Sequence, residues 1–216
     1  YRAKLLVSME RRVVILADGT YPSSERTLKI LRNADLLICC DGAAEKAISR
    51  GVIPDFIAGD MDSMPIELQR EYSDIIRKSD CQDTNDLTKA VELAKSFNPA
   101  QMTILGATGR REDHTLGNIS LLAEYVQECP FPVDMVTDHG RFFTINDSTV
   151  FDAVPGTAIS FFTFDQSLKI KSKGLEYPLD EVIFDSLWKA SLNIVSESKV
   201  SLEFSHPAVV LIFEAE

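Results

Sequence analysis

Residues 56–63, Phe56-Ile57-Ala58-Gly59-Asp60-Met61-Asp62-Ser63, join a short apolar run directly to an acidic turn. Apolar runs of this kind form strands, and Gly, Asp and Ser favour the turn that follows. Extended residues two apart project to the same side, so Asp60 and Asp62 can face one cation. Mg²⁺ is usually held by one or two carboxylates together with substrate phosphates. Taken alone, the stretch fits a surface turn better than a magnesium site, so the rest of the chain has to decide.

The same pattern of a strand followed by a loop recurs on both sides of this stretch. Further apolar runs at residues 13–17, 36–40, 102–105 and 133–137 are predicted to be strands, and residues 74–78 a modest one. Asp18-Gly19 is interpreted as a break after the first run, and Ser23 or Ser24 as the N-cap of the helix that follows. The segments between these strands carry helical patterns, of which the strongest places Leu87, Ala90, Val91 and Ala94 at i, i+3, i+4 and i+7. The next such pattern predicts one amphipathic helix whose apolar face consists of Leu116, Ile119, Leu122, Ala123 and Val126. Strands that alternate with helices indicate a mainly parallel, Rossmann-like sheet flanked by helices. We expect this α/β domain to span residues 1–137.

The pattern changes after residue 137. Short strand-like pieces follow one another between turn signals such as Asn146-Asp147, Pro155-Gly156 and Lys173-Gly174. No segment of this half carries a long helical repeat. Such a pattern predicts a small antiparallel β-sandwich domain over residues 138–216.

Composition limits the classes of function. The 216-residue chain has a net charge of −11 at pH 7, which argues against nucleic acid because polyanions call for a basic face. No apolar run approaches the roughly 20 residues of a membrane span, and the first ten residues are too weakly apolar for a secretory signal. The four cysteines lack paired CxxC spacing, so no zinc or redox site is indicated. We therefore expect a cytoplasmic protein with no nucleic-acid or membrane partner.

Four acidic or glycine-bearing loops follow predicted strands. The first is Asp41-Gly42, and the other three cover residues 59–63, 81–86 and 106–114. In open α/β sheets, ligands bind beyond the carboxyl ends of the strands, so the four loops can converge on one edge. This regular placement favours a site over separate surface turns. Ser63, just ahead of Pro65, is expected to cap the next helix instead of binding a ligand.

The third and fourth loops each open a helix. Capping accounts for one residue of Gln82-Asp83-Thr84-Asn85-Asp86, but less well for two carboxylates and an amide together. Residues 106–114 combine small residues with arginines, which suits phosphate binding at a helix start. His114 is expected to have a structural role in preference to a catalytic one. These loops indicate a Mg²⁺-dependent enzyme acting on a nucleotide or another polyphosphate, with its acceptor open.

At these residues the chain resembles the thiamine pyrophosphokinase (thiamine diphosphokinase) family. The matching residues keep the family's order over about residues 39–120, and a weaker likeness continues near residues 174–179 and 191–193. They are Asp41-Gly42-Ala43-Ala44, Pro54-Asp55, Gly59-Asp60-Met61-Asp62-Ser63, Gln82, Asp83, Asp86-Leu87, Gly106-Ala107-Thr108-Gly109, Arg111, Asp113, His114 and Asn118.

The resemblance implies transfer of the diphosphate of ATP to the hydroxyl of thiamine, which gives thiamine diphosphate and AMP. It also implies a homodimer with Mg²⁺ as cofactor. By position, Mg²⁺ would be held by Asp60, Asp62 and Asp86. The nucleotide or the reacting centre would be surrounded by Asp41, Gln82, Asp83, Thr108, Arg111 and Asp113. The carboxylates Asp41, Asp60, Asp62, Asp86 and Asp113 would form the catalytic set, and thiamine would meet Tyr177, Ser191 and Asn193.

The chain departs from the family pattern at three positions. Arg110 stands where the family usually has glycine, Asn85 where it has threonine, and Leu192 separates Ser191 from Asn193. Tyr177 fits a thiamine-packing aromatic or a buried strand tyrosine equally well, and Trp188 is expected in the core or at a rim. Two alternatives stay open: another Mg²⁺-dependent pyrophosphoryl- or nucleotidyl-transferase with a different acceptor, and a non-catalytic sensor of ATP or thiamine diphosphate.

Overall fold

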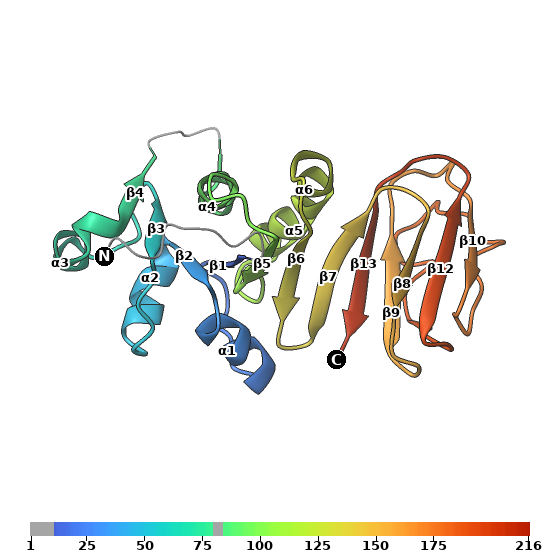
Figure 1. Ribbon diagram of the computed structural model, residues 1–216. Helices are drawn as coiled ribbons and strands as arrows, with labels where there is room; N and C mark the ends of the chain where they lie inside the picture. The colour runs from blue at the N-terminus through green and yellow to red at the C-terminus, as the bar shows by residue number, and fades with distance from the viewer. Residues whose placement is uncertain (1–10, 80–83) are drawn as a thin grey trace. The chain divides into compact units, whose positions relative to one another are not determined.

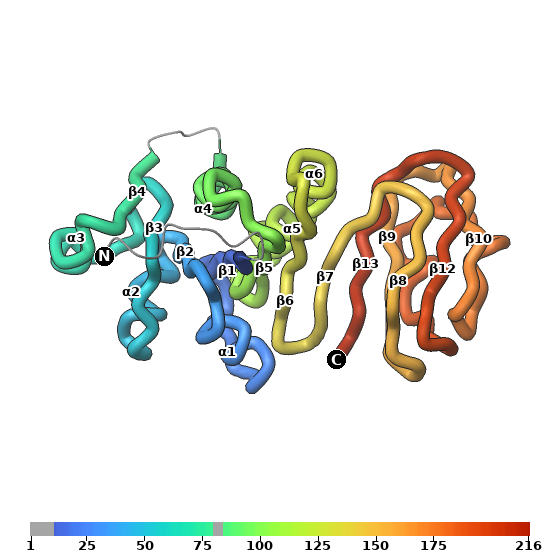
Figure 2. The backbone as a smooth tube through the Cα atoms, in the orientation of Figure 1, coloured from blue at the N-terminus to red at the C-terminus, as the bar shows by residue number. Residues whose placement is uncertain are grey.

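The computed structural model describes residues 11–79 and 84–216 (Figure 1). The chain forms two compact units, one of residues up to Ile119 with Phe131–Asp138, the other of Ser120–Pro130 with His139–Glu216. The predicted division between residues 137 and 138 placed residues 120–130 in the first domain, whereas the structure groups them with the second unit. The path of the backbone through each unit can be followed in Figure 2.

In the first unit, strands and helices alternate as the apolar pattern predicts. The elements are β1 (Arg12–Leu16), α1 (Glu25–Arg32), β2 (Leu36–Cys40), α2 (Asp41–Ile48), β3 (Phe56–Gly59), α3 (Ile66–Glu71), the 3₁₀ turn η1 (Ser73–Ile75), β4 (Ile76–Lys78), α4 (Asp86–Lys95), β5 (Gln101–Leu105), α5 (Glu112–Ser120) and β6 (Val133–Thr137).

These six strands pair in parallel in the order β4-β3-β2-β1-β5-β6. Figure 1 shows α1 and α2 on one face of this sheet and α4 on the other. β1 and β2, in the middle of the sheet, are buried on both faces, which explains why their sequences are nearly continuous apolar runs. The mainly parallel sheet with flanking helices is therefore confirmed, and the closer Rossmann-like comparison stays a prediction. Strand order reverses at β1, whose neighbours are β2 and β5.

The start of α1 is fastened to the end of β6 by one carboxylate. Asp138 accepts hydrogen bonds from the backbone N–H groups of Ser23 and Ser24, each at 3.0 Å, and from the hydroxyls of Ser23 and Thr27. Ser24 is the N-cap, as one of the two serines was predicted to be, and accepts from Thr27 N at 3.2 Å. Although burial opposes it, these hydrogen bonds hold the pKa of Asp138 well below its ordinary value.

The helical pattern after residue 112 was predicted as one amphipathic helix, and this is wrong. The structure has α5 with no buried residue, then α6 (Leu122–Glu128), which buries Leu122 and Tyr125. Leu116, expected on the buried face, is 70% exposed.

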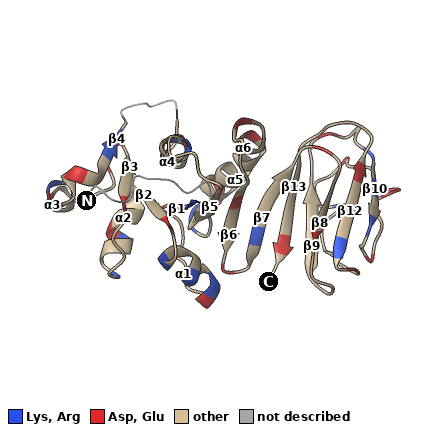
Figure 3. Cartoon of the chain, viewed as in Figure 1, with Lys and Arg blue, Asp and Glu red and all other residues tan. Residues whose placement is uncertain are grey.

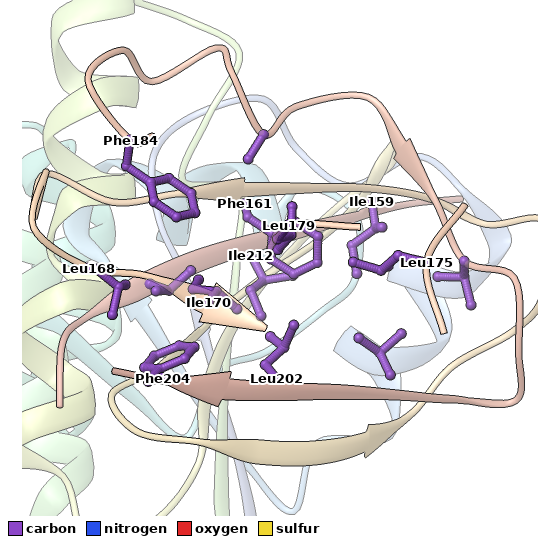
Figure 4. Packing of buried hydrophobic residues seen from close by; sticks show 14 residues of the cluster. Ile159, Phe161, Leu168, Ile170, Leu175, Leu179, Phe184, Leu202, Phe204 and Ile212 are labelled. Atoms are coloured by element: carbon purple, nitrogen blue, oxygen red, sulfur yellow. The ribbon is translucent and has the colours of Figure 1, made fainter. Parts of the chain in front are cut away.

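The second unit contains two antiparallel sheets. Besides α6 its elements are β7 (Gly140–Ile145), β8 (Thr149–Asp152), β9 (Ala158–Phe162), β10 (Ile170–Lys173), β11 (Asn193–Ile194), β12 (Lys199–Phe204) and β13 (Val210–Ala215). The strand orders are β7-β13-β9-β11 in one sheet and β10-β12-β8 in the other. Side chains from both sheets, such as Phe161, Ile212, Val200 and Leu202, share one hydrophobic core (Figure 4). The predicted antiparallel β domain is confirmed.

None of the helices in the described part of the chain combines the length and apolar character that crossing a membrane requires.

Candidate active site

A cavity of about 520 Å³ opens at the carboxyl ends of β1, β2 and β5. This is the point at which strand order reverses, and such a reversal leaves a crevice between neighbouring loops. Its described lining comes from the loops after β1, β3 and β5, from the end of β2, and from residues of α2, α4 and α5: Ala17, Asp18, Gly19, Cys40, Asp41, Ser63, Asn85, Asp86, Leu87, Ala107, Thr108, Arg110, Arg111, Asp113, His114, Thr115, Gly117 and Asn118. The expected convergence of strand-end loops is therefore seen for all four loops.

Two of these loops are joined by backbone hydrogen bonds. Gly19 N donates to Gly106 O at 2.5 Å, and Thr20 N donates to Thr108 O at 2.8 Å. A Cβ at Gly19 would lie 2.3 Å from Gly106 O, so only glycine permits this approach. The loops after β1 and β5 therefore form one firm wall of the cavity.

The acidic turn after β3 is shaped around Asp41, the first residue of α2. A Cβ at Gly59 would lie 2.9 Å from Asp41 Cγ, so the glycine makes room for this carboxylate. Met61 has a φ of 71°, which an L-residue adopts only in a tight turn. Gln69 of α3 holds the turn by donating to Met61 O and Met64 O, each at 2.8 Å.

This geometry gathers three carboxylates. One oxygen each of Asp41, Asp60 and Asp62 lies within 4.8 Å of the others. Oxygens of this kind are the ligands that Mg²⁺ prefers, so the residues present fit the predicted cation. The sequence prediction paired Asp60 and Asp62 with Asp86, whereas the three that converge most closely include Asp41.

The charges of the cluster affect one another. Asp41 is 2% exposed, and its burial together with the charges of Asp86 and Asp60 raises the pKa of its carboxyl group. Asp60 behaves in the opposite way: the hydrogen bond from Asp62 N and the nearby Lys89 ammonium lower its pKa. A buried carboxylate beside other carboxylates is electrostatically unfavourable until a cation joins it.

Lys89 links Asp86 to the cluster. Its ammonium lies 3.0 Å from Asp86 Oδ1 and 3.6 Å from Asp60 Oδ2, and its side chain is only 6% exposed. Asn85 is the N-cap of α4 and accepts from Thr88 N at 2.8 Å, so capping does account for one residue of this loop. Gln82 and Asp83 lie outside the described residues.

The loop after β5 brings the remaining predicted residues to the cavity. Thr108, Arg111 and Asp113 all line it. Arg111 donates to Asp113 through Nε at 3.1 Å and Nη2 at 2.6 Å, which lowers the pKa of Asp113. His114 lies beside them in the lining, and Asn118 donates to Ala107 O at 2.9 Å, which fixes the loop on α5.

Sequence reasoning missed two charged residues of the site. Asp18 follows β1 as Asp41 follows β2, so the Asp-Gly signal was present but was interpreted as a break. Lys89 was hidden in the helical pattern of α4. The prediction for Ser63 was wrong: α3 begins after Pro65, and Ser63 Oγ donates to Asp62 Oδ1 at 2.9 Å. Pro65 occupies the N-cap position of α3, so Ser63 lies two residues before the position from which a side chain caps a helix.

The residues predicted to meet thiamine lie in the second unit. Tyr177 is 57% exposed, so it is not a buried strand tyrosine, and Trp188, 71% exposed, is not in the core. Asn193 is buried, and its side chain bridges to the backbone of Tyr177, with Oδ1 accepting at 3.1 Å and Nδ2 donating at 2.6 Å. Ser191 Oγ donates to Trp188 O at 2.6 Å. Leu192 has a φ of 59° and is 80% exposed, so it points away from the core between its two neighbours.

Lysine and arginine positions are dispersed over the elements of both units and interleaved with acidic ones (Figure 3). At the cavity, Arg111 and Asp113 form one such local pair of opposite charges.

Two family models match this chain. One, described as the thiamin pyrophosphokinase catalytic domain, matches residues 27–131, and the other, described as the thiamin pyrophosphokinase substrate-binding domain, matches residues 140–213. Thiamine pyrophosphokinase 1 of Oryza sativa subsp. japonica is 32% identical over 43% of this chain and 44% of its own length. Thiamine pyrophosphokinase 1 of Arabidopsis thaliana is 26% identical over 79% of this chain and 75% of its own length. The chain thus spans less than half of the rice relative in its alignment.

Solved structures show the same fold. The crystal structure of thiamine pyrophosphokinase from Bacillus subtilis matches with a TM-score of 0.78 at 21% identity, over 95% of this chain and 99% of that one. Yeast thiamin pyrophosphokinase matches with a TM-score of 0.78 at 17% identity, over 97% of this chain and 88% of that one. At these identities the structural matches establish the fold.

Proposed function

The chain belongs to the thiamine pyrophosphokinase family, and we propose that it transfers the diphosphate of ATP to the hydroxyl of thiamine. The products are thiamine diphosphate and AMP. The hydroxyl oxygen of thiamine bonds to the β-phosphorus, the bond from that phosphorus to the bridging oxygen of AMP breaks, and the hydroxyl proton is released.

The observation that carries this proposal is the cluster of Asp41, Asp60 and Asp62 at the edge of the 520 Å³ cavity. Phosphoryl transfer depends mainly on positioning and charge neutralisation, which a cation held by these carboxylates would supply together with the nearby arginines. A simple surface turn would not bury Asp41 to 2% exposure among other carboxylates.

Asp41, Asp60 and Asp62, with Asp86 beside them, would hold Mg²⁺. When bound, this ion neutralises phosphate charge and orients the polyphosphate. Lys89 holds Asp60 and Asp86 close together through its two ion pairs. Thr108, Arg111 and Asp113 line the cavity and are proposed to surround the nucleotide, together with Gln82 and Asp83.

The second unit is proposed to bind thiamine. The exposed Tyr177 ring can stack on an aromatic ring, and Ser191 contributes a hydroxyl. The amide of Asn193 is engaged with the backbone of Tyr177, so it supports that residue in place. The homodimer and the cytoplasmic location stay predictions from the resemblance and from composition.

The direct test is to incubate the purified protein with ATP, Mg²⁺ and thiamine and to separate the products by chromatography. AMP and thiamine diphosphate are expected in equal amounts. ADP and thiamine monophosphate would refute the diphosphate transfer. Turnover with a different alcohol but not with thiamine would identify another transferase, and binding of ATP without turnover would identify a sensor.

Variants of the cluster provide the second part of this test. Asp60→Asn and Asp62→Asn are each expected to abolish turnover, because each removes a negative ligand oxygen from the cation site. Asp74→Asn is a matched control, since Asp74 is an exposed aspartate of η1 in the same unit. Wild-type rates in both cluster variants would contradict the assignment.

A further inference from the structure

The described lining of the cavity contains more negative than positive side chains. Asp18, Asp41, Asp86 and Asp113 face it, against the two guanidinium groups of Arg110 and Arg111. A polyphosphate carries several negative charges, so entry into this cavity depends on each cation that is available to it. The hydrogen bonds of Arg110 and Arg111 show which guanidinium group has donors left for a phosphate.

Arg111 has one edge of its guanidinium group paired with a carboxylate. Its Nε and Nη2 atoms both donate to Asp113, in the parallel two-bond geometry by which an arginine binds a carboxylate or a phosphate. The Nε–Nη2 edge of Arg111 is thus occupied by Asp113, and the pair carries no net charge.

Arg110 is held in a different way. Only its Nη1 atom donates to described residues, to Asp18 Oδ2 at 2.7 Å and to Asp18 O at 2.9 Å. Its Nε and Nη2 donors have no partner among residues 11–79 and 84–216. Asp18 is also shared with Lys46, whose ammonium lies 2.6 Å from Asp18 Oδ1. One carboxylate and two cations leave this group with a net positive charge.

The backbone that carries Arg110 is fixed as well. Thr20 Oγ1 donates to the carbonyl of Gly109 at 2.8 Å, and a Cβ at Gly109 would lie 2.4 Å from Thr20 Oγ1. Gly109 has a φ of 85°, which glycine adopts at little cost. The backbone of Arg110 therefore belongs to a firmly held loop, and its guanidinium group is tethered by Asp18. Both restraints reduce the conformational entropy that the side chain loses when it binds an anion.

We propose that Arg110 is a phosphate-binding residue of this cavity, tethered by Asp18 so that its remaining guanidinium edge receives the polyphosphate of the nucleotide. This inference rests on the proposed function, because it takes ATP as the ligand. It assigns a substrate contact to a position at which the family pattern usually has glycine. Arg111 then lies beside the nucleotide as part of a neutral pair with Asp113.

The test is calorimetric titration of the wild type and of Arg110→Met with three ligands in magnesium-containing buffer. The ligands are the unreactive analogue α,β-methylene ATP, inorganic triphosphate and adenosine. Losing one charged hydrogen-bonding group is expected to weaken binding of the ATP analogue and of triphosphate by roughly 10- to 100-fold. Binding of adenosine is expected to be unchanged. Arg110→Lys keeps the charge without the fork and is expected to recover part of the lost affinity.

Arg70→Met is the matched control, because Arg70 is an exposed arginine of α3 outside the cavity lining. It is expected to bind all three ligands as the wild type does. In turnover, Arg110→Met is expected to raise KM for ATP while kcat changes little, which a general loss of structure would not do.

Equal affinity of Arg110→Met and the wild type for the ATP analogue would overturn the inference. So would an equal loss for adenosine and for the analogue, because that would indicate a structural role. If the wild type binds the analogue but forms no thiamine diphosphate, the proposed function fails while the comparison of arginine variants still decides the inference.

Discussion

Replacing Asp41 by asparagine should separate the stability of the first unit from its capacity to bind magnesium. Asp41 is 2% exposed and has two other carboxylates with oxygens within 4.8 Å. Asparagine keeps an oxygen that can accept from Gly42 N, a hydrogen bond of 2.7 Å in the wild type, but it removes the charge. When a chelator keeps magnesium away from the protein, we therefore expect Asp41→Asn to have a higher free energy of unfolding than the wild type.

The size of each effect can be worked out. Relief of a buried, repelled charge, offset by a weaker hydrogen bond from Gly42, is expected to raise the free energy of unfolding by about 1 kcal/mol. Magnesium at 100 times its dissociation constant stabilises the wild type by about 2.7 kcal/mol. A site weakened about a hundredfold by loss of one ligand gains only about 0.4 kcal/mol at the same magnesium concentration. The order of stability of the two proteins should thus reverse when magnesium is added.

The assay is urea denaturation followed by circular dichroism, in EDTA and across a magnesium titration. Asp74→Asn serves as the control and should follow the wild type in both conditions, because Asp74 is exposed. The reasoning is refuted if Asp41→Asn is less stable than the wild type in EDTA and gains as much stability from magnesium.

Three further predictions concern the two units. Phe161→Ala is expected to destabilise the second unit by about 3–5 kcal/mol in denaturation experiments, because Phe161 is fully buried, whereas Phe164→Ala, at 86% exposure, should stay within about 0.5 kcal/mol; similar losses in both would contradict the core assignment. Asp138→Ala should cost about 2 kcal/mol at pH 7 through the lost hydrogen bonds to the start of α1. Because the folded pKa of Asp138 is depressed, its stabilisation is present above the unfolded value of about 3.9 and is lost as the pH falls below it, so the variant and the wild type should converge in acid; a constant difference down to pH 2 would disprove this. Gly42→Ala should destabilise the first unit by about 1–3 kcal/mol, since its Cβ would lie 2.7 Å from Asp18 Cγ; an unchanged urea midpoint would show that Asp18 moves away freely.

Much of the first unit was predictable because its signals are local. A parallel strand covered on both faces has to be apolar along its length, and an amphipathic helix has to repeat its apolar residues every three or four positions. The runs at β1 and β2 and the stripe from Leu87 to Ala94 therefore identified the alternating architecture. The antiparallel strands of the second unit were predictable from the turn residues between them, which are also a local signal.

The pair of carboxylates in the acidic turn could also be predicted from the sequence. Asp60 and Asp62 were predicted to face one cation, and their oxygens do converge, although through the tight turn at Met61 and not through the extended backbone that the prediction assumed. Only the fold could reveal the partner of this pair. Asp41 is 19 residues away from Asp60 along the chain, and it reaches the cluster because β2 and β3 are neighbours in the sheet and Gly59 leaves space for it.

The sequence alone thus determined the strand-and-helix order, the antiparallel second unit and the pair of carboxylates with which the acidic turn begins, because each depends on contacts between near neighbours. The tertiary structure decided which side chains are engaged and which are available. Arg110 and Arg111 are adjacent and chemically identical, yet Arg111 pairs with Asp113, two residues away, whereas Arg110 pairs with Asp18 in the loop after β1. That difference depends on loops brought together from residues 18–20 and 106–110, and no local pattern records the distance between them.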